Sequence, residues 1–274
     1  MRIFNYYREG KPVAGFELNQ KKHKLPFETT TDEVIKNYEQ IKKELNPDKC
    51  EEILGEIKYA PAVLFPQKIL CIGLNYSDHA DELREQKLTV PTVFGKFNNA
   101  LSAHEEEVKL PYAGGKYDYE AELTVVIGKE CNNITKDTAD EYIFGYTVGN
   151  DMSVREVQKA TTQWILGKSF DKFAPLGPSI VTKDSIDVSS LTIQSRVNGE
   201  LRQNSNTKNM IFTCAEIVSH IAQYMTLLPG DVILTGTPAG VIAGYPEDKQ
   251  IWLKSGDRVD IEIENIGTLT TFLK

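Results

Sequence analysis

The stretch YDYEAELTVVIGKE, residues 117–130, places three acidic residues at alternate positions directly before an apolar run. The run contains Leu, Thr, Val, Val and Ile, a composition typical of a buried strand. Because residues two apart in a strand project from the same face, the carboxylates of Asp118, Glu120 and Glu122 would lie roughly 7 Å from their neighbours. Like charges at this spacing repel, so the stretch predicts a strand whose acidic end needs a positive partner.

A divalent cation between Glu120 and Glu122 would supply that partner, with each side chain giving one oxygen. Ligation by carboxylates, without a nearby His or Cys, favours hard ions. The pattern therefore predicts Mg²⁺ or Mn²⁺ rather than Zn²⁺, with Ca²⁺ as a further option. The alternative is a solvent-facing edge strand that carries acidic side chains on its outer face. The Glu-x-Glu spacing alone favours this alternative, so other segments have to decide.

The composition is typical of a soluble globular chain, because 41% of its 274 residues are hydrophobic and 26% are charged. A net charge of −8 argues against nucleic acid as a partner, since phosphate binding depends on Lys and Arg. No apolar run approaches the roughly 20 residues of a membrane span, and the first residues lack a signal-peptide pattern. A cytoplasmic protein is therefore expected. The four cysteines are scattered without a C-x-x-C pair, which argues against a zinc knuckle and a disulfide framework.

Two parts of different texture meet near the proline-containing stretch YAPAVLFPQ, residues 59–67. Residues 1–65 predict a small N-terminal α+β domain with two short strands and a helix over residues 30–46. Residues 66–274 contain many short apolar runs, and Asn198-Gly199 lies between two of them as a hairpin turn. Few helices are expected among these strands, at residues 77–87, 153–165 and 213–225. This strand-rich pattern without βαβ alternation predicts an α+β, mainly β fold.

Further polar residues extend the acidic strand toward a site. The apolar run FGYTVGN ends on Asp151, which delivers a third carboxylate at a strand terminus; its alternative role is to cap a helix that begins near Ser153. Lys168 lies in the Gly-, Phe- and Pro-rich stretch WILGKSFDKFAPLGP, which favours a lysine that points into a pocket. A lysine whose ammonium reaches solvent along an apolar surface is the simpler alternative. The small residues of LTGTPAG, residues 234–240, allow backbone N–H groups to approach an anion, although a plain turn has the same composition.

A possible acid–base pair lies in the segment GLNYSDHADELRE. His79 and Glu82 stand at i and i+3 of the helix expected over residues 77–87, so their side chains are neighbours. A carboxylate beside an imidazole raises its basicity and fixes its orientation, which suits a base that deprotonates water. The alternative is an exposed ion pair on a charged helix, which is the commoner arrangement when such a pair is taken alone.

Six segments, in this order, resemble the fumarylacetoacetate hydrolase family from about residue 68 to the end of the chain. They are GLNYSDHADE, EAE, GNDMSVREVQ, GKSFDKFAPLGP, VNGELRQ and GDVILTGTPAG. Each segment is a weak signal alone, but six in the family's order are specific. The resemblance implies a mixed-sheet, roll-like or barrel-like catalytic domain behind a smaller N-terminal domain, assembled as a homodimer.

The resemblance also implies a metal site. Carried across residue by residue, it makes Glu120, Glu122 and Asp151 the ligands of Mg²⁺ or Mn²⁺, and Lys168 a cation beside the metal. Asp118 has no ligand role in the family and is expected to support the strand face.

Other residues acquire roles in handling the substrate. The resemblance makes His79 with Glu82 a pair that activates water on a lid-like helix. It implies contacts to substrate by Gln158, Thr237 and Lys96, with Thr237 at the substrate carboxylate. One position departs from the pattern, because some relatives that act on acylpyruvates or oxaloacetate carry Arg where this chain has Leu74. That departure weakens the transfer of their substrate preference.

The implied substrate is a small 2-oxo acid, and the leading hypothesis is hydrolysis of a C–C bond in acylpyruvate or β-diketone acids. The metal and Lys168 would hold the enolate charge while His79 takes a proton from the attacking water. An oxaloacetate-type decarboxylase or a 2-hydroxyhepta-2,4-diene-1,7-dioate-type isomerase would need only the enolate and proton transfers. A ligand-binding protein that retains the fold is the non-enzymatic alternative, against which the three mutually repelling carboxylates argue.

Overall fold

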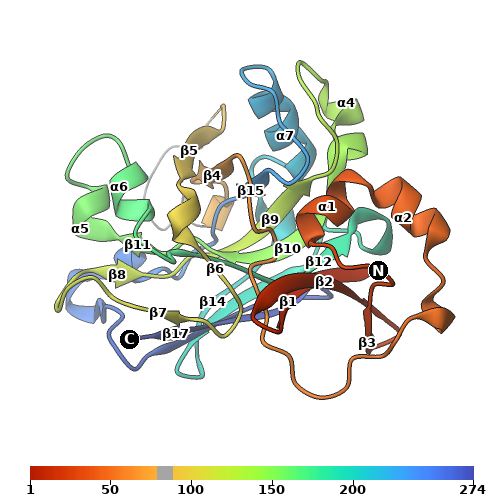
Figure 1. The fold of residues 1–274 in the computed structure, drawn as a ribbon. Helices are drawn as coiled ribbons and strands as arrows, with labels where there is room; N and C mark the ends of the chain where they lie inside the picture. The colour runs from red at the N-terminus through yellow and green to blue at the C-terminus, as the bar shows by residue number, and fades with distance from the viewer. Residues whose placement is uncertain (79–88) are drawn as a thin grey trace.

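The computed structural model describes residues 1–78 and 89–274 of the chain (Figure 1). The acidic stretch leads into β9 (Ala121–Ile127), which pairs antiparallel with β10 (Ile143–Asn150) inside the larger sheet. On its other side β9 pairs antiparallel with β15 (Val232–Leu234), so it is an inner strand and all of its residues are buried. The alternative of an acidic edge strand facing solvent is therefore wrong.

Among the described residues the larger sheet has ten strands, and it is mixed because β15 pairs parallel with β4 and β12 pairs parallel with β6. Its order is β3 (Lys21–Lys24), β2 (Lys11–Leu18), β1 (Arg2–Arg8), β12 (Ala174–Thr182), β10, β9, β15, β4 (Ile69–Gly73) and β5 (Thr92–Lys96), with β6 (Leu101–Ser102) beside β12. The longest of these strands, β12, was not expected from the sequence. Its stretch APLGPSIVT contains two prolines, which remove backbone donors and conceal the strand pattern.

The second sheet packs against the centre of the first. Its order is β14 (Glu200–Asn206), β13 (Thr192–Val197), β16 (Arg258–Ile263), β17 (Gly267–Leu273) and β7 (Glu107–Val108). The hairpin expected at Asn198-Gly199 is confirmed, because these two residues, both with positive φ, join β13 to β14. Leu123 and Val148 from the first sheet share one buried apolar cluster with Ile193, Ile261 and Leu269 from the second.

The expected α+β, mainly β fold is confirmed, with few and short helices. Within the described ranges neither of these two sheets closes into a barrel, since each strand order has two open ends. The helices are α1 (Thr31–Lys36), α2 (Tyr38–Glu44), α4 (Lys136–Ala139), α5 (Arg155–Gln158), α6 (Ile165–Lys168) and α7 (Cys214–Ala222). A short ladder of β8 (Tyr117–Asp118) with β11 (Ser153–Val154) lies beside α5 and α6 (Figure 1).

Three expected helices differ from the structure for local reasons. The helix expected over residues 30–46 breaks at Asn37, whose side-chain amide donates to the carbonyl of Glu33 and ends α1. The helix expected over residues 153–165 is α5 and α6 instead, because the Thr161 hydroxyl bonds to the backbone of Gln163 between them. The third, α7, starts at the Thr213 capping box but ends before residue 225. The helix expected over residues 77–87 lies almost wholly outside the described residues.

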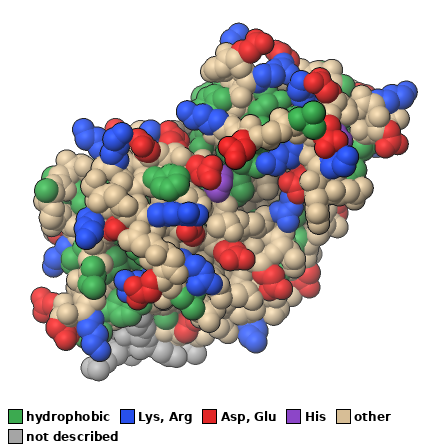
Figure 2. All heavy atoms as spheres, turned by 90° about the horizontal axis from the view of Figure 1, so that it is seen from below, with side chains coloured by type: hydrophobic (Ala, Val, Ile, Leu, Met, Phe, Trp, Pro, Cys, Tyr) green, Lys and Arg blue, Asp and Glu red, His purple; other side chains and the backbone are tan. Residues whose placement is uncertain are grey.

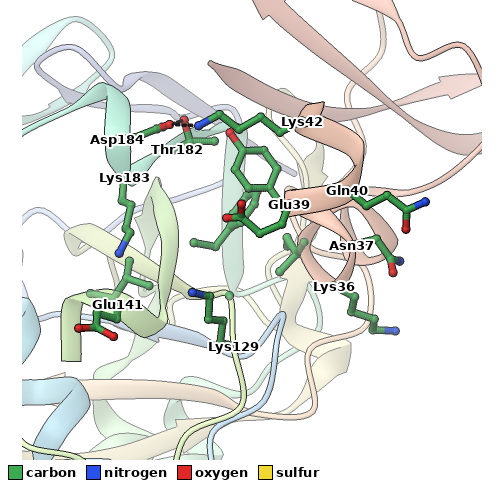
Figure 3. Close-up of a pocket in the computed structure, with 15 residues that line it drawn as sticks. Lys36, Asn37, Glu39, Gln40, Lys42, Lys129, Glu141, Thr182, Lys183 and Asp184 are labelled. Carbon is green, nitrogen blue, oxygen red and sulfur yellow. Dashed lines mark hydrogen bonds and ion pairs between the residues drawn. The ribbon is translucent and has the colours of Figure 1, made fainter. Parts of the chain in front are cut away.

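The N-terminal strands extend the larger sheet, because Arg2 and Ile3 of β1 pair with β12. Between α1, α2 and the sheet lies a cleft of about 490 Å³, and the ion pair of Lys42 with Asp184 joins its two sides (Figure 3). This cleft adjoins the end of β9 that is remote from the acidic residues, roughly 25 Å along the strand at about 3.3 Å per residue. The division of the chain at residue 65 stays a prediction.

The surface carries mixed charge. Figure 2 shows acidic and basic side chains interspersed over one face, without an extended basic area among the described residues drawn there. In the ranges 1–78 and 89–274, no helix combines the length and the apolar composition that a membrane span requires.

The substitution Gly145→Ala is expected to lower the free energy of unfolding by about 2–4 kcal/mol. A Cβ at this position of β10 would overlap the carbonyl oxygen of Val181 on β12, and both are held by strand pairing. Urea unfolding followed by circular dichroism measures the change. Lys11→Ala, at an exposed position, is the control with an expected change within about 0.5 kcal/mol. Wild-type stability in the Gly145 variant would contradict the predicted overlap.

Candidate active site

The pairing of β9 with β10 brings the predicted carboxylates together. Glu120 directly precedes β9 and Asp151 directly follows β10, and the backbone N–H of Asp151 donates to the carbonyl of Glu120 over 3.0 Å. Glu122, inside β9, lies opposite Gly149 of β10. Glu120, Glu122 and Asp151 each offer one oxygen within 4.8 Å of the others, and all three residues are buried.

Three buried cations surround these carboxylates. The Lys168 ammonium, at the end of α6, lies 2.7 Å from Glu120 Oε2 and 2.8 Å from Asp151 Oδ2. Lys96, the last residue of β5, lies 2.5 Å from Asp151 Oδ1. Arg155, the first residue of α5, places Nη1 2.7 Å from Glu120 Oε1. Elements remote in sequence therefore converge on the junction of β9 and β10.

The charges shift the pKa values of the buried groups in different directions. Burial alone would raise the pKa of Glu120, but the charges of Lys168 and Arg155 outweigh it and hold that pKa below its ordinary value. Burial, together with the negative charges of Asp151 and Glu120, raises the pKa of Glu122 well above its ordinary value. For Lys168, burial lowers the pKa, but Asp151 and Glu120 overcome this and raise it. Lys168 therefore stays charged at neutral pH.

The donor set fits a hard divalent cation. The converging atoms are carboxylate oxygens, which Mg²⁺ and Mn²⁺ prefer, and the group contains no thiol or imidazole that would favour a softer metal. Glu122 accepts a hydrogen bond from the backbone N–H of Gly236 over 2.7 Å, so the loop after β15 fixes one of its oxygens. Among the residues that the structure describes, Glu120, Glu122 and Asp151 are the group that can hold such an ion.

A pocket of about 290 Å³ opens above Glu120 and Lys168. Its lining contains both apolar and polar residues: Ile72, Gly73, Leu74, Phe94, Glu120, Arg155, Gln158, Lys159, Trp164, Lys168, Thr237, Val241 and Ala243. Among the apolar ones, Phe94 and Trp164 meet edge to face with ring centroids 5.2 Å apart and form a rigid part of the wall.

Two polar lining residues can donate hydrogen bonds. Gln158 accepts from Arg155 Nη1 through Oε1 over 2.9 Å, and its amide nitrogen has no hydrogen-bond partner among residues 1–78 and 89–274, so it can donate to a ligand. The Thr237 hydroxyl accepts from Gln203 Nε2 over 2.8 Å, so its own hydrogen can be donated to a ligand. Arg155 Nη2 is not available to a ligand, because it lies 2.8 Å from Asp118 Oδ2. The Gln158 and Thr237 donors suit an anionic ligand.

Comparison with known proteins agrees with this geometry. A family model described as fumarylacetoacetate (FAA) hydrolase C-terminal matches residues 68–274. The chain belongs to the fumarylacetoacetate hydrolase family. Among relatives of the family, the mitochondrial oxaloacetate tautomerase FAHD2B of Bos taurus is 44% identical over 221 residues, which cover 78% of this chain and 69% of that protein.

Solved structures match the whole length of this chain, as two examples show. The fumarylacetoacetate hydrolase EaFAH from psychrophilic Exiguobacterium antarcticum has a TM-score of 0.90 and 32% identity, with 99% of that chain covered. The 5-carboxymethyl-2-hydroxymuconate delta-isomerase from Mycobacterium smegmatis has a TM-score of 0.81 and 32% identity, with 98% of that chain covered. The resemblance to the family and the expected fold class are thus confirmed, whereas the family members carry several different reaction names.

The structure decides between several alternatives left open by the sequence. Asp151 does not cap a helix, because α5 begins at Arg155 and Val154 occupies its N-cap. Lys168 does not reach solvent, because only 1% of it is exposed. Gln158, Thr237 and Lys96 lie at the site or directly behind it, as already described. His79 and Glu82 lie outside the described residues.

Arg155 is the residue that sequence analysis missed. It lies in the quoted motif GNDMSVREVQ, four residues after Asp151, and a buried arginine between two acidic side chains is a strong sign of a site. The motif contains Arg155, but its acidic partners, Asp118 and Glu120, are identified only by the folded arrangement of β8, β9 and α5.

Binding of Mg²⁺ is expected to weaken as the pH falls and to release protons at low pH. Glu122 has a raised pKa and must lose its proton before it can give an oxygen to the ion. Affinity therefore increases with pH through that raised pKa and levels off above it. Isothermal titration calorimetry in two buffers of different protonation enthalpy counts the released protons. Binding to the wild-type protein that is tight and independent of pH, with no proton release, would contradict the role of Glu122.

Proposed function

We propose that this protein is a divalent-metal-dependent enzyme that forms and stabilises the enolate of a small 2-oxo acid, with keto–enol tautomerisation of an oxaloacetate-like acid as its leading reaction. One observation carries the proposal: a buried carboxylate cluster that fits a hard cation opens into a pocket lined by hydrogen-bond donors. Glu120, Glu122 and Asp151 would hold Mg²⁺ or Mn²⁺, with Ca²⁺ as a further option.

The residues around the cluster match the head of a 2-oxo acid. Gln158 and Thr237 can donate to a ligand in the pocket, Arg155 adds positive charge to its lining, and a carboxylate accepts several hydrogen bonds at once. Gln203 holds the Thr237 hydroxyl and also accepts from the backbone N–H of Ala121, so the donor is fixed relative to β9. Lys96 forms an ion pair with Asp151 Oδ1, whereas Lys168 contacts the other oxygen of that carboxylate.

Lys168 is a fixed cation in this scheme. Asp151 and Glu120 raise its pKa above the ordinary value, and in the proposed scheme its ammonium group acts through its charge. When bound, the divalent ion supplies positive charge that lowers the energy of an enolate oxygen. Lys168 adds a second positive charge, and because its side chain is buried, that charge is weakly screened and its electrostatic stabilisation is strong.

We favour tautomerisation over the other reactions of the family because it requires only enolate formation and proton transfer. In addition, a bovine relative at 44% identity bears the name oxaloacetate tautomerase. Hydrolysis of a C–C bond in acylpyruvate or β-diketone acids is the second candidate, favoured by the fold similarity to EaFAH over the whole chain. It would require His79, oriented by Glu82, to activate water. Decarboxylation and double-bond isomerisation use the same enolate and are outcomes that the assays below detect.

A non-catalytic ligand-binding protein is the alternative from another class. Burying several carboxylates and cations costs free energy that apolar residues of similar size would avoid. The presence of these buried charges despite that cost favours a catalytic role over simple ligand binding. The homodimer and the cytoplasmic location expected from the sequence stay proposals.

Replacing Lys168 with Met is expected to lower kcat at least about 100-fold, because the uncharged side chain cannot stabilise the enolate. The measurement follows the ultraviolet absorbance of enol-oxaloacetate with saturating Mg²⁺. Lys172→Met is the matched control, since Lys172 is in the same segment but pairs with Glu106 at the surface. Equal kcat values for both variants would contradict the role of Lys168.

Replacing His79 with Ala is expected to separate the candidate reactions. Hydrolysis of acetylpyruvate should be lost if His79 activates water, whereas Mg²⁺ binding should persist. The measurement is a panel of oxaloacetate and acetylpyruvate with and without Mg²⁺, which records tautomerisation, CO₂ release and C–C cleavage. Undiminished hydrolysis in the variant would refute the role of His79, and a wild-type protein that turns over none of the panel while binding Mg²⁺ would favour the non-catalytic alternative.

A further inference from the structure

Asp118 is a completely buried carboxylate that directly adjoins the proposed metal ligands without joining them. Its Oδ1 accepts from the backbone N–H groups of Tyr119 and Ile242, both over 2.9 Å. Its Oδ2 accepts from the N–H of Ala243 over 3.0 Å and from Arg155 Nε over 2.8 Å. Asp118 is therefore saturated with donors, and one of them is the guanidinium group that also touches Glu120.

Arg155 divides its guanidinium group between two carboxylates. Nε and Nη2 both lie 2.8 Å from Asp118 Oδ2, whereas Nη1 alone lies 2.7 Å from Glu120 Oε1. The second oxygen of Glu120 faces Lys168 on the metal side. A free guanidinium group favours a two-pronged contact with one carboxylate, and Asp118 prevents that contact with Glu120 by occupying the other edge of the fork.

We propose that Asp118 is a positioning residue that restrains Arg155 and thereby keeps Glu120 available to the divalent cation. If Asp118 loses its charge, Arg155 gains freedom to turn both prongs onto Glu120 and to compete with the ion for its oxygens. The competition is strong because all three side chains are buried, where charges are weakly screened. This inference rests on the metal site of the proposed function.

A double-mutant cycle on metal affinity tests the inference without using turnover. Asp118→Asn is expected to raise the Kd for Mg²⁺ about tenfold or more in the wild-type background. In the Arg155→Gln background the same substitution is expected to change the Kd by no more than about threefold, because no guanidinium group is left to restrain. Calorimetry with Mg²⁺ alone gives all four affinities.

The cycle separates positioning from simpler explanations. A loss of negative charge, or a collapse of the backbone near Ile242 and Ala243, would weaken binding by the same factor in both backgrounds, and equal factors overturn the proposal. Glu156→Gln is the matched control. It removes a carboxylate from α5 that bonds Lys116 and Tyr112 and does not touch Arg155, so the Kd should stay within about twofold.

A crystal structure of the wild-type protein with Mn²⁺ provides a test that does not depend on the folding of any variant. Arg155 should retain Asp118 and keep a single nitrogen on Glu120. A guanidinium group bidentate on Glu120 with the ion present overturns the proposal. A wild-type protein that binds neither ion would instead refute the metal site itself, so failure of the inference and failure of the proposed function are distinguishable.

Discussion

Four carboxylates buried at the junction of two neighbouring strands are the constraint on which the site depends. Glu120, Glu122, Asp151 and Asp118 would repel one another strongly in an environment of low dielectric constant. This repulsion is offset by cations from three separate elements, β5, α5 and α6. The positions of these short elements are thus set by charge as well as by apolar packing, which explains how helices of four residues persist beside the sheet.

The sequence predicts those parts of the fold that depend on neighbours along the chain. The Asn198-Gly199 turn and the apolar run of β9 are local signals, and both have the expected structure. Strand β12 escaped prediction because Pro175 and Pro178 conceal it, and its partners β1 and β10 are far away in sequence. The helix expected after Ser153 was wrong because a single hydroxyl, that of Thr161, competes for the backbone.

The site was predictable as a set of residues but not as a network. Alternate spacing placed Glu120 and Glu122 on one face, and the strand end supplied Asp151. The pairing of each cation with a particular carboxylate oxygen depends on the conformation of the chain between β10 and α5. The spacing of residues in the sequence does not predict that conformation. Arg155 was therefore overlooked although its motif was recognised, and the contact of Asp118 with that arginine was not foreseen.

The end of the site that contains the carboxylates cannot distinguish among the reactions of the family. In the proposed function, Glu120, Glu122 and Asp151 would hold the ion, and Lys168 would add its charge near the carboxylate and carbonyl groups that every 2-oxo acid possesses. Selection among substrates must arise farther out, where the pocket is lined by the aromatic pair of Phe94 and Trp164, by Leu74, and by Lys159. Apolar side chains together with the exposed Lys159 can accept either an apolar tail or a second carboxylate. In the proposed function, the charge network near β9 would supply the enolate chemistry, and the outer wall would select the acid.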